Sequence, residues 1–172
     1  MSRYTGPRLR ILRALNIDLP GLTRKGARRR ETRPGQHGFA FRRRPSEYGM
    51  QLREKQIVRR NYGLTERQMR KLFDKAKRKS GVTGTEMLVL LEQRLDNIVF
   101  RAGFAPTIPA ARQLVNHGHI TVNGGRLDIV SALVRVGDTI ALRERSRSHP
   151  MAVGSWPAPT LPVPSWIERK PE

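Results

Sequence analysis

Five polar side chains that could contact a nucleic acid fall close together in the sequence: Arg112, Gln113, Asn116, His117 and His119. On a helix, Asn116 follows Arg112 by four residues and His117 follows Gln113 by four, so these side chains share one surface. They offer a positive charge, amide donors and acceptors, and two rings that can stack. Such groups recognise RNA loops and sugar–phosphate edges. A solvated helix face has the same composition, so this pattern alone leaves both interpretations open.

Two helices are predicted to position these residues. The first is predicted to begin at a capping-box pattern at 83–86 and to end at Gly103. It is predicted to bury an apolar stripe. The members of this stripe are Leu88, Leu91, Leu95, Ile98, Val99 and Ala102. The second is predicted to be capped by Thr107 and to end at Gly118 in a left-handed conformation. Pro109 is tolerated in its first turn. Its inward face is Ala110, Ala111, Leu114 and Val115.

A small antiparallel sheet is expected after the second helix. Ile120 and Val122 alternate with polar residues, and Asn123-Gly124 is a strong hairpin signal, although a second glycine at 125 loosens the register. Asn123 joins the candidate RNA contacts. Further short strands, with a turn at 137–138, are predicted around Leu127, Ile129, Val134, Val136, Ile140 and Leu142.

The charge of the chain is large and uneven. Lys and Arg number 34 against 14 Asp and Glu, for a net charge of +20. Residues 1–80 carry 24 basic and 6 acidic side chains, whereas residues 81–145 carry 7 and 6. An excess of this size indicates a polyanionic partner. The distribution predicts that residues 1–80 neutralise phosphates while the nearly neutral part recognises shape and polar edges.

Residues 1–45 are predicted to form a basic arm that becomes ordered on a polyanion, and little of its basic, glycine-rich part after Pro20-Gly21 is expected to be buried. A short helix is possible at 8–15, with Leu9, Leu12 and Leu15 as its apolar side. A disordered solubility tail is the alternative, against which Phe39 and Phe41 argue. The candidate phosphate contacts of the arm are Arg28, Arg29, Arg30, Arg42, Arg43 and Arg44.

Two helices are predicted between residues 46 and 80. Ser46 is expected to cap the first, which runs to about Arg60 and ends before Tyr62-Gly63. Its candidate phosphate contacts are Arg53, Lys55, Arg59 and Arg60. A second capping box at 65–68 begins the next helix, whose apolar face is Met69, Leu72, Phe73 and Ala76.

Several motifs resemble a known family. Leu-Asp at 95–96, Ala-Arg-Gln-Leu-Val at 111–115, His-Gly-His-Ile at 117–120 and Val-Asn-Gly at 122–124 resemble the small RNA-binding domain named after small-subunit ribosomal protein four. Pro-Gly-Gln-His-Gly at 34–38, Glu-Tyr-Gly at 47–49, and Leu-Arg-Glu-Lys-Gln at 52–56 are similar to the bacterial or plastid family of that ribosomal protein itself. The resemblance covers residues 1–145, and Pro-Val-Pro-Ser-Trp at 162–166 is similar to the family's tail.

The expected fold class is α+β, with a helical N-terminal domain and basic arm followed by a small two-helix module with an antiparallel sheet. The expected domains are the arm at 1–45, a helical domain at 46–90, the module at 91–145 and a proline-rich tail at 146–172. The tail is predicted to lack regular structure, to pack with the helical domain, and to dock Trp156 and Trp166 on the body or on a neighbour. The family usually continues further past this tail.

The resemblance implies a structural constituent of the small ribosomal subunit. It implies binding to a multi-helix junction of small-subunit ribosomal RNA, nucleation of assembly of the subunit body, and a contribution to translational accuracy. It also implies contacts with ribosomal proteins five and twelve and, in some bacteria, repression of the protein's own messenger. The alternative is a stand-alone RNA-binding or ribosome-recycling factor that uses the same module.

Several other classes are disfavoured by the sequence. No catalytic pattern is present, and Asp96, beside Arg94, is interpreted as an arginine-paired carboxylate, so an enzyme with a small-molecule substrate is not expected. With no cysteine and 4 scattered histidines, neither a metal nor another cofactor is expected. No apolar run is long enough to span a membrane, and no secretory segment follows Met1. The expected location is the ribosome, in the cytoplasm or the plastid stroma.

Overall fold

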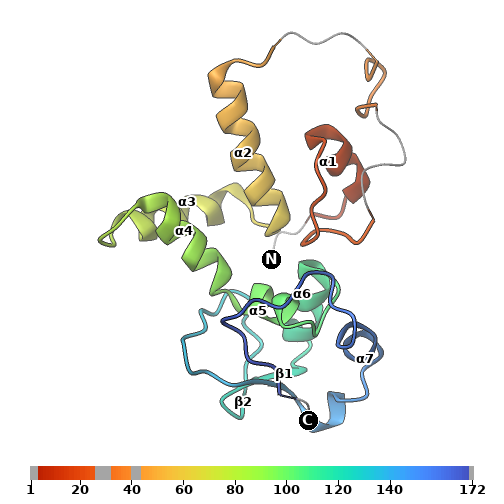
Figure 1. Cartoon of the computed structure of the whole chain (residues 1–172), viewed down its shortest axis with the longest axis vertical. Coiled ribbons are helices and arrows are strands. Elements are labelled where there is room, and N and C mark those ends of the chain that lie inside the picture. Colours follow the sequence, from red (N-terminus) through yellow and green to blue (C-terminus); the bar gives the residue numbers. More distant parts are fainter. Residues whose placement is uncertain (1–3, 26–31, 40–43, 171–172) are drawn as a thin grey trace. The chain divides into compact units, whose positions relative to one another are not determined.

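The computed structural model describes residues 4–25, 32–39 and 44–170, and it confirms the α+β class (Figure 1). The chain divides into two compact units, Met1–Met69 and Arg70–Glu172. The first contains only helices and loops among its described residues. The second contains helices and a three-stranded sheet. No helix in the described part of the chain has the length and apolar composition needed to cross a bilayer.

Helix α1 (Arg8–Leu15) packs in the first unit against helix α2 (Glu47–Asn61). A small cluster of buried side chains lies at this contact and consists of Ile11, Leu12, Leu19 and Leu22. Leu15 of α1 and Ile57 of α2 pack against it and are partly buried. The Gly21 amide donates to Asn61 Oδ1 at 3.1 Å. The short helix that the sequence allowed at 8–15 is therefore present, and its apolar side has a partner in α2.

The two helix starts predicted between residues 46 and 70 are confirmed. Ser46 Oγ accepts the Gly49 amide at 3.2 Å at the start of α2. Helix α3 (Glu66–Lys77) begins with a complete capping box. In it the Gln68 amide donates to Thr65 Oγ1 at 3.3 Å, and the Thr65 amide donates to Gln68 Oε1 at 2.9 Å. Each side chain thus satisfies a backbone donor that the helix itself leaves without a partner.

The single long helix predicted before Gly103 is wrong: the segment forms α4 (Thr83–Glu92) and α5 (Leu95–Arg101), with an extended residue, Arg94, between them. The capping box predicted at 83–86 is also absent, because Val82 occupies the cap position and no side chain accepts a hydrogen bond there. Leu88, predicted to face the core, is 47% exposed.

A distant segment explains the break between α4 and α5. The Leu95 amide donates to the Ala132 carbonyl at 2.9 Å, and the Val134 amide donates to the Gln93 carbonyl at 2.8 Å. Arg94 forms an antiparallel bridge with Leu133. Residues 130–134, which we call the strap, therefore take backbone groups that a continuous helix would use internally.

Helix α6 (Ile108–Asn116) agrees with its prediction. Thr107 Oγ1 accepts the Ala110 amide at 3.4 Å, and Gly118 follows the helix with φ 69°. Helices α5 and α6 pack together in the second unit. The side chains with the least exposure in this unit come mainly from this packing and from the adjoining strand, and include Leu95, Val99, Ile108, Leu114, Val115 and Ile120.

The sheet has the order β2-β1-β3, from β1 (Ile120–Val122), β2 (Gly125–Arg126) and β3 (Ile140–Leu142), all antiparallel. Asn123 and Gly124 form the turn with φ 52° and 80°, the positive values that a two-residue hairpin needs. The strands predicted around Leu127, Ile129, Val134 and Val136 do not form. Val136 and Ile129 are exposed, and Val134 belongs to the strap.

The tail contains more regular structure than its prolines predict. A 3₁₀ turn, η2 (Glu144–Ser146), precedes α7 (Pro150–Ser155), in which Pro150 takes a first-turn position that needs no amide donor. The docking predicted for Trp156 is confirmed, since its ring lies 4.9 Å from that of Phe104 and the Arg169 guanidinium lies 3.7 Å above it. Trp166 is instead 55% exposed.

Candidate nucleic-acid interface

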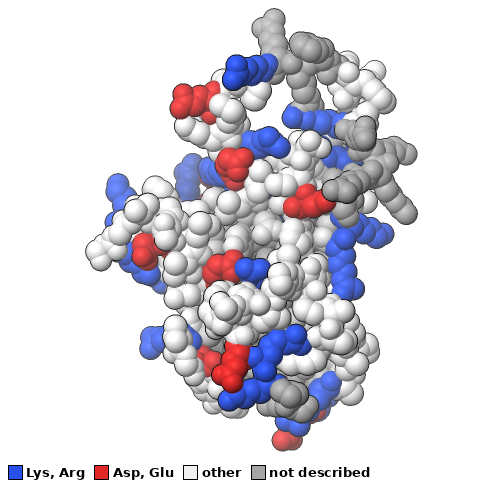
Figure 2. Space-filling view, viewed as in Figure 1, with Lys and Arg blue, Asp and Glu red and all other residues white. Residues whose placement is uncertain are grey.

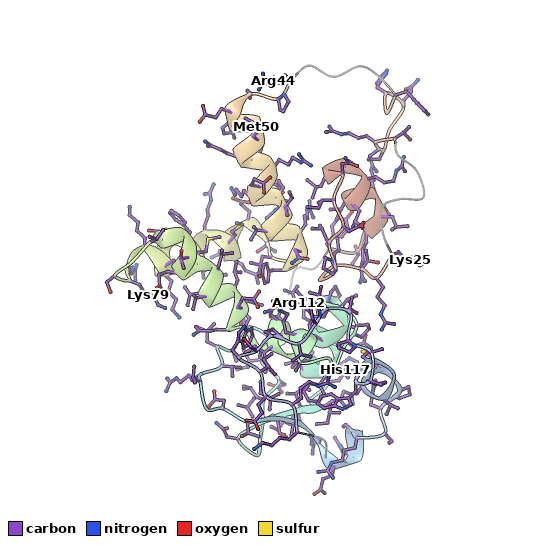
Figure 3. The ribbon with its side chains drawn as sticks, in the orientation of Figure 1. Lys25, Arg44, Met50, Lys79, Arg112 and His117 are labelled. Carbon is purple, nitrogen blue, oxygen red and sulfur yellow. The ribbon has the colours of Figure 1, made fainter. Side chains whose placement is uncertain are left out.

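The predicted polar surface of α6 is present for three of its members. Gln113, Asn116 and His117 are exposed along the helix and at its end, while Ala111, Leu114 and Val115 are buried beneath them. In Figure 3, Arg112 and His117 are labelled on this helix. The three exposed side chains supply amide and imidazole groups to solvent on one element, an arrangement suited to RNA edges.

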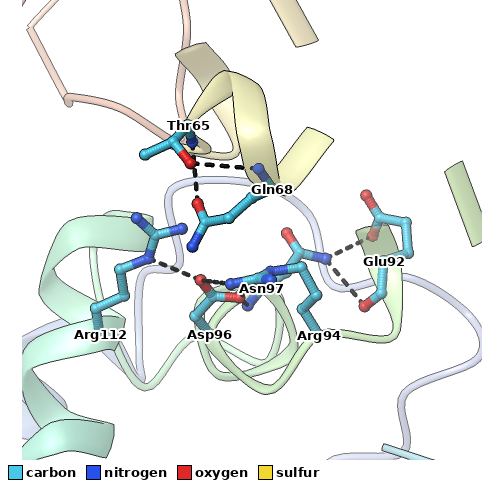
Figure 4. A network of polar contacts seen from close by, with 7 residues as sticks. All are labelled: Thr65, Gln68, Glu92, Arg94, Asp96, Asn97 and Arg112. Atoms are coloured by element: carbon cyan, nitrogen blue, oxygen red, sulfur yellow. Dashed lines mark hydrogen bonds and ion pairs between the residues drawn. The ribbon is translucent and has the colours of Figure 1, made fainter. Parts of the chain in front are cut away.

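Arg112 differs from the prediction because it is held by a buried carboxylate. Its Nε donates to Asp96 Oδ2 at 2.8 Å, and its side chain is 23% exposed (Figure 4). Asp96 is 1% exposed and also accepts both Nε and Nη2 of Arg94, each at 3.0 Å. The Asn97 amide supplies another hydrogen bond at 2.9 Å. The interpretation of Asp96 as arginine-paired is confirmed.

This arrangement makes Asp96 the polar centre of the module. A buried carboxylate is tolerated only when it is paired and hydrogen-bonded, and both conditions are met here. The carboxylate joins the extended residue Arg94, the first turn of α5 and the first half of α6 (Figure 4). Arg112 therefore fixes the orientation of α6 in addition to any contact it makes with RNA.

Asn123 is exposed, but its two polar side-chain atoms are hydrogen-bonded within the module. Its Nδ2 donates to Asp138 Oδ1 at 2.9 Å, and its Oδ1 accepts the Thr139 amide at 2.8 Å. The Arg135 amide donates to Asp138 Oδ2 at 2.7 Å. This bond has the largest effect on the pKa of Asp138 and the bond from Asn123 the next largest, and both lower it below its usual range. Both polar atoms of Asn123 thus join the β1–β2 turn to the loop before β3.

His119 lies in a cluster that the sequence did not predict. Its Nδ1 is 2.9 Å from Ser146 Oγ, its ring is 4.9 Å from that of His149, and the ring of His117 is 6.0 Å away. Burial, then the charges of neighbouring histidines and arginines, lowers the pKa of His119. No local signal could have placed residues 146–149 beside residue 119, because the β3 register and the η2 turn together determine that contact.

The predicted cations of α2 are bound within the first unit. Arg53 Nη2 donates to the Leu15 carbonyl at 2.7 Å, Lys55 pairs with Glu66, and both Nε and Nη2 of Arg59 donate to Gln56. Arg60 lies 5.1 Å from the centre of the Tyr4 ring, and burial followed by the charge of Arg59 lowers its pKa. These cations stabilise the packing of α2, so a phosphate must share them with their present partners.

Of the arm's six candidate phosphate contacts, the structure describes one, Arg44. Arg44 is exposed just before α2, and Figure 3 labels it there. Arg28, Arg29, Arg30, Arg42 and Arg43 lie outside the described residues. Blue Lys and Arg side chains outnumber the red Asp and Glu on the face shown in Figure 2. Among the described residues, no three His, Asp or Glu side chains converge as a metal site would require.

Two helices packed together and followed by a hairpin, with amides and imidazoles exposed on the second helix, define a small RNA-binding module. Two family models match the chain: the ribosomal protein S4/S9 N-terminal domain over residues 3–92 and the S4 domain over residues 93–140. The chain is therefore matched over both its helical part and its module.

Relatives match along nearly the whole chain. Small ribosomal subunit protein uS4 of Methylobacillus flagellatus is 54% identical over 168 residues, which is 97% of this chain and 82% of that protein. The uS4 protein of Prochlorococcus marinus strain SARG is 58% identical over 98% of this chain and 82% of its own length. The uS4 protein of Synechococcus elongatus is 59% identical over 94% of this chain and 78% of its own length. The chain belongs to the family of small ribosomal subunit protein uS4.

This membership distinguishes between the alternatives that the sequence left open. The match over residues 3–92 lies outside the small module, so a protein that shares only that module does not account for it. The resemblance to the ribosomal family is confirmed, and so is the prediction that the chain is a structural protein and not an enzyme.

Proposed function

We propose that this chain is a constituent of the small ribosomal subunit that binds a multi-helix junction of its ribosomal RNA and nucleates assembly of the subunit body. The observation that carries the proposal is the family match over both parts of the chain. The charge supports it, since a net charge of +20 needs a polyanion to offset self-repulsion.

The proposed mechanism divides affinity from selectivity. The cations of residues 1–80 bind phosphates and release counterions, a contribution that does not depend on sequence. The exposed face of α6, with Gln113, Asn116 and His117, fits a particular RNA surface. Arg112 contributes both by holding α6 through Asp96 and by its partly exposed guanidinium.

The affinity part is tested by the salt dependence of binding. We would replace Arg28, Arg29 and Arg30 with Gln, because deleting residues 1–45 would also remove the cluster that packs α1 on α2. Each lost phosphate contact should reduce the slope of log affinity against log salt concentration by roughly one unit. Filter binding to a small-subunit ribosomal RNA transcript measures the slope. An unchanged slope would remove these arginines from the proposed contacts.

The selectivity part is tested by comparing two RNAs. Gln113→Ala and Asn116→Ala should weaken binding to the ribosomal transcript while leaving binding to a scrambled RNA and the salt slope nearly unchanged. Gln51→Ala on α2 is the matched control, since this exposed glutamine bonds only within its own helix in the described structure. Equal loss on both RNAs would mean that the α6 face contributes no discrimination.

The finer parts of the proposal concern partners. We infer contacts with ribosomal proteins five and twelve and an influence on translational accuracy, both supported by the family resemblance. Crosslinking of assembled small subunits, followed by mass spectrometry, tests the protein contacts. Recovery of links to other proteins but none to those two would reject this part of the proposal.

A further inference from the structure

Three of the 4 histidines of the chain come together on the second unit. The ring of His119 is 4.9 Å from that of His149 and 6.0 Å from that of His117. His117 ends α6, His119 immediately precedes β1, and His149 caps α7. The S4-domain match ends at residue 140, so His149 and Ser146 reach this place from the tail.

The hydrogen bonds of the cluster determine which ring nitrogens remain for a ligand. His149 Nδ1 accepts the Met151 amide at 3.2 Å, so this nitrogen is already used within the protein. His119 uses Nδ1 in its 2.9 Å contact with Ser146 Oγ. In both rings Nε2 is the atom without a bond among the described residues. The rings do not converge as metal ligands would.

The charged side chains that shift the pKa of His119 are all basic. The charged and titratable groups that act on its ring are His149, His117, Arg145 and Arg143, in that order, and all are basic. Arg143 is also fixed by its backbone, since its amide donates to the His119 carbonyl at 2.9 Å. Together with burial, these groups lower the pKa of His119. Glu144 lies in the same η2 turn as Arg145 and Ser146, but no carboxylate is among the groups that shift the pKa of His119.

We propose that His117, His119, His149 and Arg143 form one binding surface for an RNA backbone phosphate, and that His119 takes up a proton when the phosphate binds. The proposal rests on the proposed function, because it names part of the surface that the RNA would contact. The proton goes to His119 Nε2, which then donates to a phosphate oxygen, while in this protonated ring Nδ1–H donates to Ser146 Oγ.

The direction of the pH effect follows from linkage. A bound phosphate is negative, so it raises the pKa of His119, which burial and then the neighbouring basic groups lower in the free protein. Between the free and bound pKa values, binding is accompanied by proton uptake, and affinity rises as the pH falls. One proton permits a rise of at most about tenfold per pH unit. Above the pKa that His119 has in the complex, the affinity no longer changes with pH through this residue.

The test measures binding of the full chain to a small-subunit ribosomal RNA transcript from pH 8.0 to pH 6.0 at constant ionic strength. We expect the wild-type affinity to rise by about three- to tenfold over this range, within the one-proton limit. His119→Gln should flatten the rise, because it removes the group that takes up the proton. His149→Asn removes one of the groups that lower the pKa of His119, so it should move the rise to higher pH. Asparagine keeps a side-chain oxygen that can cap α7, so His149→Asn removes the imidazole without removing the cap.

Controls separate this inference from the proposed function. His37→Gln removes the histidine outside the cluster and should keep the full rise, and Trp156 fluorescence checks that α7 remains docked. A rise that persists in the His119→Gln, His149→Asn double variant overturns the inference. So does a wild-type affinity that does not change with pH while the transcript is still preferred over scrambled RNA, in which case the proposed function stands. Loss of that preference at every pH overturns both.

Discussion

Replacing Asp96 with Asn should destabilise the second unit more than any exposed charge change. Asp96 is 1% exposed and accepts hydrogen bonds from Arg94, Arg112 and the Asn97 amide. Asparagine has nearly the same shape, but its NH₂ faces donors and its neutrality leaves Arg94, 5% exposed, without a counter-charge. Breaking a buried ion pair in this way costs about 3–5 kcal/mol.

Urea unfolding followed by tryptophan fluorescence measures this loss. Both tryptophans, Trp156 and Trp166, lie in Arg70–Glu172, so the signal reports the unit that contains Asp96. With a denaturant slope of about 1–3 kcal/mol per molar, Asp96→Asn should lower the unfolding midpoint by about 1–5 M. The expected effect is large because the whole stability of such a unit is about 5–15 kcal/mol.

Two matched variants make the reasoning refutable. Glu86→Gln removes the Lys79 ion pair, whose side chains are 41% and 25% exposed, and should cost at most about 1 kcal/mol. The double variant Asp96→Asn, Arg94→Met removes the buried charge as well as its partner and should recover much of the loss. If Asp96→Asn costs no more than Glu86→Gln, or if the double variant is less stable than the single one, the assignment of Asp96 as the polar centre is wrong.

Three further predictions follow from local geometry, and urea unfolding of the second unit measures each of them. Thr107→Ala should cost about 0.5–1 kcal/mol, because the cap bond of 3.4 Å is long, whereas Thr83→Ala, where no cap bond exists, should change stability by less than about 0.5 kcal/mol. Gly118→Ala should cost about 1 kcal/mol because φ is 69°, whereas Gly84→Ala, in open space within α4, should stabilise by about 0.5–1 kcal/mol. Folding lowers the pKa of Asp138. Its contribution to the free energy of unfolding is therefore present above the unfolded pKa of about 4 and is lost as the pH falls through the folded pKa. Asp138→Asn should thus reduce the loss of stability between pH 4 and pH 2. Equal effects within the threonine pair or the glycine pair, or an unchanged acid profile, would contradict the corresponding geometry.

The helix starts could be predicted because their signals are local. Ser46, Thr65 and Thr107 each accept an amide within the next three residues, so the sequence contains both partners of each contact. The Asn123-Gly124 turn was predictable for the same reason, since the two residues need only adopt positive φ. The inward face of α6 likewise repeats at helical spacing.

Several of the features that the sequence did not predict have a different cause, which is a partner far away in the chain. The apolar stripe through Leu95 is continuous at helical spacing, and only the strap, some 35 residues later, reveals that the helix must break. Arg112 has the spacing of an outward residue, but a buried carboxylate on α5 draws it inward. The burial of α1 depends on its packing against α2. The side-chain contact of His119 is with Ser146, which belongs to the tail.

The strap also has a consequence for synthesis. While residues 130–134 are still inside the exit tunnel, nothing competes for the amide of Leu95, and local preference favours one uninterrupted helix through residues 83–101. The bonds that hold Arg94 extended thus become available only after residues 130–134 have left the tunnel, and the final placement of Asp96 against Arg112 waits for that part of the chain.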